Sequence, residues 1–492
     1  MGYIKLSHAG DKEYRMTKLN VFTKSLNISV MPEYPQSDGP SQVLDNLQAR
    51  TGATSITTSP YVMEPSNASD AGREPPADGK AGAVRLLDRD LFGKRELTVR
   101  TSPSFVPDKS LYAGLRYQPS EPDALTERES HKISQFIDQT KARGMQAYMQ
   151  VQSAIPPGYK VQFGGAIPED RALLPNGSEH EGRVDKNASL ASPHITDYGC
   201  ALLRDLIQAY PNLDGLRVDW PEYPPYDFDS LFFDFSGHAE AAATRLGYDF
   251  ERMRNDTQRL LDFILVTMTD HHITRFLESD DFSVWDVLNN YPGVLDLKSL
   301  KGDLVSEMLE KYRRTIDDAS GGKMDFVVQG FPPPWTQASG FDIKKLAPHV
   351  SGIGIKLYTM HWPMMVRGYA DRILASNSNV SEKYILRGIF KILDLLDATP
   401  PSQINDVRYP EPDEPHLAGI QAQARKIIET RKLAGDTPVH VFSHAYGPID
   451  DYRARMEVAW ETSGHRMVVN RYGYLSDEKL NVLGEITGAE TS

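Results

Sequence analysis

The chain has 492 residues, and 54 Lys and Arg against 67 Asp and Glu give it a formal net charge of −13. This acidic balance argues against nucleic acid or an anionic membrane surface as the main partner, because both require a basic footprint. Hydrophobic residues make up 40% and charged residues 25% of the chain, the mixture of an ordinary globular protein. The single cysteine, Cys200, excludes an internal disulfide and a cysteine-rich zinc site.

The start of the chain carries no visible targeting signal. Residues 1–24 are polar and lack the apolar core of a signal peptide. The most apolar long stretch, residues 260–268, is far too short to span a bilayer. We therefore expect a soluble, cytoplasmic protein, and no feature of the sequence predicts its oligomeric state.

Short apolar-alternating runs recur along the chain, most of them followed by a helical pattern. The expected strands are residues 26–31, 53–59, 144–152, 214–220, 325–330, 352–359, 438–443 and 466–471. The expected helices between them are residues 41–50, 126–143, 195–210, 299–318, 416–433 and 449–463. This alternation predicts parallel βαβ units, and the number of strands predicts an α/β fold closed into a (β/α)8 TIM barrel.

We expect one catalytic barrel, residues 19–492, after an N-terminal tail of residues 1–18. The barrel carries insertions at about 60–125 and 221–298, which are the long loops after the second and fourth strands. Long loops in a compact domain are usually functional or disordered. In a TIM barrel they lie over the carboxyl ends of the strands, where active sites form.

The expected strands have one polar and one apolar face. Residues facing the outer helices are apolar, so the polar residues point into the barrel. The inward polar positions include Asn27, Ser29, Glu33, Gln150, Gln152, Arg217, Asp219, Lys356, Tyr358, His440 and His444. A purely structural barrel is filled with Val, Ile and Leu, so this set favours a polar ligand. A polar network satisfied within the protein is the alternative.

The fourth strand is the most informative segment. Its end, Asp-Gly-Leu-Arg-Val-Asp-Trp-Pro-Glu-Tyr-Pro, places Asp219 at the strand end and Glu222 in the loop after Pro221. Arg217, on the face of Asp219, is expected to hold that carboxylate ionised. An ionised carboxylate beside a second one of higher pKa is what glycosidic bond cleavage needs. An Arg217–Asp219 pair that only stabilises the barrel mouth is the alternative.

Asp-Gly-Leu-Arg-Val-Asp resembles the fourth-strand motif of the α-amylase superfamily, in which the last Asp is the nucleophile. The whole segment, with residues 232–239 and 246–254, is more similar to bacterial glycoside-hydrolase-like TIM barrels. The resemblance implies a sugar-active barrel with Asp219 as its functional carboxylate. It supplies no partner acid, because the fifth strand ends without an acidic residue and the seventh without a Glu nucleophile. Glu222, Glu33 and Glu64 remain candidates for that acid, and we prefer Glu222.

Aromatic residues at or beyond the strand ends strengthen the sugar hypothesis, because sugar rings stack their C–H faces on aromatic rings. Together with the inward polar residues they give the expected substrate-binding set: Arg217, Glu33, Gln150, Gln152, Trp220, Trp335, Lys356, Tyr358, His361, His444, Asn470 and Tyr472. The inward-facing cations Lys356 and Arg217 are compatible with an acidic sugar as substrate. The expected partner is therefore a carbohydrate, acidic or oligomeric forms included.

Histidines suggest a different chemistry. His440 and His444 lie about 13 Å apart along a strand, which is too far for one metal ion. A metal site of His444, His361 and Asp219 is an open alternative, but we expect no metal and no cofactor. The leading function is a glycoside hydrolase using Asp219 and Glu222. A sugar lyase or isomerase and a catalytically inactive sugar-binding barrel are the alternatives.

Overall fold

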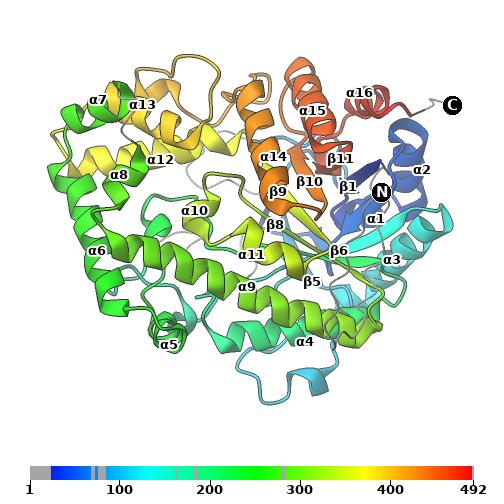
Figure 1. Ribbon diagram of the computed structural model, residues 1–492. Helices are drawn as coiled ribbons and strands as arrows, with labels where there is room; N and C mark the ends of the chain where they lie inside the picture. Colours follow the sequence, from blue (N-terminus) through cyan, green and yellow to red (C-terminus); the bar gives the residue numbers. More distant parts are fainter. Residues whose placement is uncertain are drawn as a thin grey trace, which may run out of the picture.

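The computed structural model describes residues 24–67, 72–75, 85–160, 164–180, 187–278 and 283–489. Parallel strands close into an eight-stranded barrel in the order β1-β11-β10-β9-β8-β7-β6-β2, and helices surround it (Figure 1). These strands are β1 (Ser25–Ser29), β2 (Ser55–Thr58), β6 (Gln146–Gln152), β7 (Gly215–Asp219), β8 (Asp325–Gly330), β9 (Gly352–Leu357), β10 (Val439–His444) and β11 (Arg466–Asn470). The predicted (β/α)8 barrel is confirmed, and every predicted strand overlaps one of these. The expected N-terminal tail lies outside the described residues.

The helices that follow barrel strands cover the outside of the barrel with their apolar faces. They include α1 (Glu33–Ser37), α2 (Pro40–Thr51), α3 (Ala124–Ala142), α4 (Pro193–Ala209), α9 (Pro292–Ser320), α14 (Ile420–Ala434), α15 (Ile449–Ser463) and α16 (Asp477–Thr487). Six of them correspond to the predicted helices. Their buried residues form one continuous core with the outward faces of the strands.

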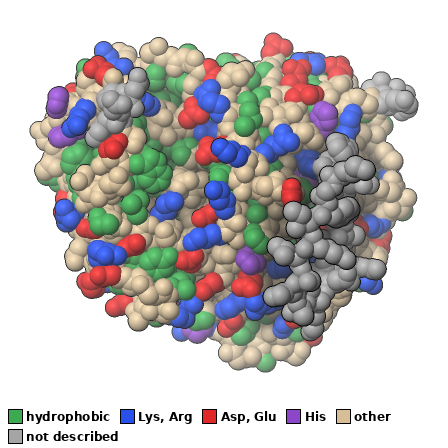
Figure 2. Space-filling model, in the orientation of Figure 1, with side chains coloured by type: hydrophobic (Ala, Val, Ile, Leu, Met, Phe, Trp, Pro, Cys, Tyr) green, Lys and Arg blue, Asp and Glu red, His purple; other side chains and the backbone are tan. Residues whose placement is uncertain are grey.

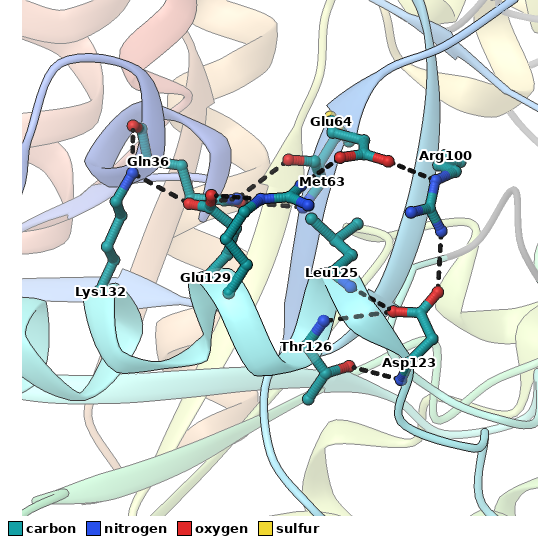
Figure 3. Close-up of polar contacts among 10 residues, drawn as sticks. Gln36, Met63, Glu64, Arg100, Asp123, Leu125, Thr126, Glu129 and Lys132 are labelled. Atoms are coloured by element: carbon teal, nitrogen blue, oxygen red, sulfur yellow. Dashed lines mark hydrogen bonds and ion pairs between the residues drawn. The ribbon is translucent and has the colours of Figure 1, made fainter.

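The connection between β2 and α3 contains a small antiparallel sheet that the sequence analysis did not predict. Its strands β3 (Tyr61–Pro65), β4 (Arg73–Glu74) and β5 (Leu97–Pro103) pair in the order β3-β5-β4. Arg100 on β5 donates to Glu64 on β3 at 2.5 Å and to Asp123 at 2.8 Å, and Asp123 caps the start of α3 (Figure 3). These contacts fix the sheet to α3.

Two further connections carry helices. After β7 come η5 (Asp229–Phe232), α5 (Gly237–Leu246), α6 (Phe250–Asp262), η6 (Phe263–Thr267), α7 (Asp270–Glu278) and α8 (Val284–Leu288). A smaller apolar cluster packs α5 and α6 against α9. After β9 come α12 (His361–Ser376) and α13 (Glu382–Leu393), which the sequence analysis did not predict, although α13 buries one clear apolar face. After β8 come two helices of one turn, α10 (Thr336–Ser339) and α11 (Ile343–Leu346).

Inside the barrel, below the level of Asp219, the side chain of Arg217 is stacked between aromatic rings. Arg217 is 2% exposed, and its guanidinium lies 5.0 Å from the ring of Tyr148 and 5.2 Å from that of Phe442. Gly215 makes room for this stack, because a Cβ there would come within 2.5 Å of the Tyr148 ring. Nε and Nη1 of Arg217 find no hydrogen-bond partner among the described residues, so ring contacts rather than a satisfied polar network hold this residue.

The outer surface carries charges of both signs. Figure 2 shows Lys and Arg interspersed with Asp and Glu over the visible face. Within the described ranges, no helix combines the length and the apolar character that crossing a bilayer demands.

Candidate active site at the carboxyl ends of the strands

The end of β7 has an unusual backbone. The strand stops at Asp219, and Trp220 adopts a φ of +58°, in the left-handed region. This conformation costs a bulky residue on the order of 1–3 kcal/mol and is often associated with functional sites. With Pro221 it ends the pairing with β6 and β8. Glu222 therefore lies in the loop, as the sequence analysis expected.

Asp219 is held by groups from three strands. Its Oδ1 lies 2.5 Å from Nζ of Lys356 on β9, and it accepts a hydrogen bond of 2.9 Å from the backbone N–H of Trp220. Its Oδ2 faces Nε2 of Gln150 on β6 at 3.5 Å. Gln150 in turn accepts from Gln329 on β8 at 3.1 Å. Since only 10% of the Asp219 side chain and 1% of that of Lys356 is exposed, the pair lies in a medium that screens it little.

The prediction that Arg217 is the counter-ion of Asp219 was wrong, because Lys356 holds that carboxylate. Arg217 lies one layer lower, between the rings of Tyr148 and Phe442, and burial lowers its pKa to about 10. Lys356 takes its place because the strands of the barrel are staggered. The ladder pairs Asp219 with Gln329 and Gln329 with Gly354, which puts Lys356 one inward position further along β9.

Glu222 is a buried acid beside this pair. It is 1% exposed, and its Oε1 accepts a hydrogen bond of 2.8 Å from the N–H of Phe331, the residue after β8. Burial raises the pKa of Glu222 to about 7. The positive charge of Lys356 and a hydrogen bond from Ser339 lower this pKa, and the negative charge of Asp219 raises it. In the described part of the chain, no hydrogen-bond partner reaches its Oε2.

Aromatic and imidazole rings continue from this point along the ends of β9 and β10. The Trp220 ring lies 5.8 Å from that of Tyr226, whose hydroxyl is 3.4 Å from Nδ1 of His361. Tyr358 lies between His361 and His444, with ring centroids 5.8 and 5.5 Å away. The structure thus brings these four predicted binding residues together, and Tyr226 joins them.

The alternative metal site does not form. Asp219 is paired with Lys356, and His361 and His444 lie on either side of Tyr358. Across the described ranges, no three His, Cys, Asp or Glu side chains converge as metal ligands would.

Several other predicted residues make no side-chain contact with Asp219 or Glu222 among the described residues. Trp335 packs against Phe331 and Trp362, and Tyr472 packs against Tyr34 and accepts a hydrogen bond of 2.9 Å from Asn46 on α2. Glu64 pairs with Arg100 and Arg128 beside α3 (Figure 3). Gln152 pairs with Asp219 in the strand ladder, and the Asn470 carbonyl accepts from the N–H of Ala445 at 2.6 Å. No ring or side-chain contact joins Trp335 or Tyr472 to the carboxylates among the described residues.

Glu33 belongs to a second buried cluster on the other side of the mouth. Its Oε2 accepts a hydrogen bond of 3.0 Å from the Tyr61 hydroxyl, and its Oε1 lies 3.6 Å from Nη2 of Arg471. The same Nη2 is in contact with Glu74 on β4, and Glu74 is 2.5 Å from Nζ of Lys160. Burial lowers the pKa of Arg471, but the nearby Glu33 carboxylate and tyrosines hold it above its ordinary value.

Sequence reasoning missed several members of both clusters. Gln329 carried a usable signal, because the alternation of β8 turns it inward like Asp219. Phe331 acts through its backbone N–H from a loop, Ser339 is the last residue of the one-turn helix α10, and Glu74 lies on a strand of two residues. Such short irregular segments have no periodicity to read.

No family model matches the chain, and no curated protein matches it. Among solved structures, it is similar to the PgaB (BpsB) glycoside hydrolase domain from Bordetella bronchiseptica, at 12% identity over 90% of this chain and 99% of that one, with a TM-score of 0.40. It is also similar to the catalytic domain of beta-amylase from Paenibacillus polymyxa, at 10% identity over 94% and 96%, with a TM-score of 0.46. A chitinase from Chromobacterium violaceum follows, at 7% identity over 95% and 100%, with a TM-score of 0.38. The closed parallel barrel that the resemblance implied is present in the strand pairing of this chain itself.

Proposed function

We propose that this protein is a glycoside hydrolase whose reacting groups are Asp219 and Glu222. The observation that carries the proposal is the unequal pair at the end of β7. Asp219 is held by a cation at 2.5 Å, and Glu222 beside it has a pKa of about 7. Glycosidic cleavage requires one carboxylate that is ionised and one carboxyl group that is able to donate a proton.

Glu222 acts as the general acid. Its pKa of about 7 leaves a large share of the group protonated near neutral pH. Oε1 accepts from the Phe331 N–H, so the proton belongs on Oε2, which has no partner among the described residues. From there it passes to the glycosidic oxygen as the bond to the leaving sugar breaks, and water then adds to the anomeric carbon and returns one proton to the carboxylate pair.

Asp219 stabilises the positive charge that develops on the sugar ring. Lys356 and the Trp220 N–H bind Oδ1, which leaves Oδ2, with its long contact to Gln150, as the more weakly bound oxygen. The neighbouring rings of Trp220, Tyr358 and His361 supply the aromatic and polar contacts that sugars use. The substrate class is a carbohydrate.

A sugar lyase or isomerase is the second candidate. Lys356 favours it, because a buried amine at the centre of the mouth, with Tyr358 on the same face of β9, is a suitable proton-transfer group.

Product analysis with a panel of neutral and acidic glycans distinguishes these functions. Hydrolysis yields a new reducing end for each bond cleaved, and a lyase yields an unsaturated sugar. The Asp219→Asn/Glu222→Gln double variant serves as the blank. Unsaturated products, or products formed equally by the double variant, would overturn the proposal.

A further inference from the structure

Arg471 follows the last residue of β11 and is buried at the barrel mouth, with 8% of its side chain exposed. Around the ring of strands, β11 lies four positions from β7 in either direction, so Arg471 is diametrically opposite Asp219. The rings of Tyr358 and His444, at the ends of β9 and β10, lie along the rim between them. A ligand lying across the mouth therefore meets the carboxylates at one end and Arg471 at the other.

Among the described residues, two carboxylates face Arg471: Glu33 from the barrel and Glu74 from the insertion after β2. Glu33 follows the end of β1 and is fixed by the Tyr61 hydroxyl at 3.0 Å, so it is a built-in counter-ion. Glu74 comes from β4, a strand of two residues that pairs with β5 through Arg73–Thr98 and Glu74–Leu97, next to a hydrogen bond of 2.9 Å from the Val99 N–H to the Gly72 carbonyl. Its carboxylate reaches Arg471 and Lys160 from the insertion rather than from the barrel. Because the ladder between β4 and β5 is short, few of its hydrogen bonds oppose a movement of Glu74 away from Arg471.

Not every N–H group of the Arg471 guanidinium has a hydrogen-bond acceptor among the described residues. Its Nη2 contacts both carboxylates, while its Nε is buried and no acceptor among the described residues reaches it. A carboxylate free to approach side-on binds Nε and Nη2 together, in the bidentate geometry that Arg favours. Glu74, tethered to β4, does not achieve this.

We propose that Arg471 and Lys160 form a subsite for the carboxylate of an acidic sugar, and that Glu74 occupies this subsite in its place. The ligand carboxylate satisfies Arg471 Nε, replaces Glu74 at Lys160, and leaves Glu33 as the permanent counter-ion. The inference rests on the proposed function, whose substrate it narrows to anionic glycans.

Calorimetric titration of the full chain with sodium glucuronate, and with glucose as the neutral probe, tests the subsite directly. Glu74→Gln removes the internal competitor and takes one negative charge away from Arg471 and Lys160. We expect it to bind glucuronate at least 10-fold more tightly than the wild type does, with no change for glucose. Adding Lys160→Met or Arg471→Lys to Glu74→Gln should abolish the gain in glucuronate affinity. Lys160→Met removes a positive charge, and Arg471→Lys removes the planar guanidinium that binds a carboxylate through two N–H groups.

Glu64→Gln is the matched control. Glu64 lies on the same insert sheet and pairs with Arg100 and Arg128 (Figure 3), so its loss changes the net charge equally without touching the subsite. A lower melting temperature for Glu74→Gln with wild-type glucuronate affinity would overturn the inference and make the cluster a structural clamp. Since monosaccharide binding requires no turnover, this result is independent of whether any glycan is cleaved.

Discussion

In the part of the chain that the structure describes, Lys356 faces two carboxyl groups at the end of β7, whereas across the mouth Arg471 and Lys160 face Glu33 and Glu74. Both clusters are buried and both combine carboxylates with cations. The difference is the charge balance. On the β7 side, no second cation pairs with Glu222 among the described residues, and burial raises the pKa of Glu222 to about 7.

The comparison shows how one barrel mouth separates two tasks. A buried group whose charged and neutral forms are close in free energy is suited to moving a proton. A cluster in which each carboxylate has a cation is suited to exchanging one anion for another. Four predictions test whether the two sides differ in this way.

The largest expected effect is that of Asp219→Asn. Asparagine keeps the shape but removes the negative charge needed at the developing oxocarbenium centre, so turnover should fall at least ~10³-fold, about 4 kcal/mol. Turnover and melting temperature are measured on the same sample. The control is Asp214→Asn, at the opposite end of β7, where Asp214 accepts a hydrogen bond of 2.8 Å from the Ala147 N–H. Near-normal turnover in folded Asp219→Asn would contradict the catalytic role.

Glu222→Gln should reduce turnover by about 10²-fold, because it removes the proton donor. The loss should be greater for alkyl glycosides than for aryl glycosides whose phenolate leaves without protonation. Comparing the two substrate classes on one preparation checks this. An equal loss for both classes would show that Glu222 is not the acid.

Lys356→Met should move the pH dependence of kcat/KM. In the wild type, we expect activity to fall as pH rises through about 7, because Glu222, with its pKa raised to about 7, loses its proton there. The charge of Lys356 lowers this pKa, so its removal should shift the alkaline limb to higher pH. Lys160→Met, on the other side of the mouth, should leave the limb in place. A shift to lower pH in Lys356→Met, or an equal shift in Lys160→Met, would be inconsistent with the comparison.

The smallest effect concerns stability. The pKa of Glu222 rises from 4.5 to about 7 on folding, so its contribution is complete below pH 4.5 and is lost as pH rises through 7. Glu222→Gln lacks this dependence. The free energy of unfolding of Glu222→Gln minus that of the wild type should therefore increase between pH 5 and pH 8, by at most about 3 kcal/mol. Denaturant unfolding at both pH values measures the difference, and a constant difference would refute the raised pKa.

The sequence by itself determined the barrel and the end of β7. Alternation of period two is a local property, so each barrel strand was visible without knowledge of its neighbours. The stop at Asp219 was visible as well, because Pro221 has no N–H to continue a ladder. The sequence analysis did not predict strands β3 and β4, because they are short, or helix α12, because it begins within the site itself.

Only the tertiary structure decided which cation meets which carboxylate. Arg217 is two residues from Asp219 in the chain, yet the stagger between strands brings Lys356 to that carboxylate and leaves Arg217 between two aromatic rings. Glu74 reaches Arg471 across almost four hundred residues of chain, through an inserted strand with no periodicity. The local pattern fixes which face a side chain takes, but its charge partner depends on the shear of the closed barrel and on the path of the insertions, which no short stretch of sequence encodes.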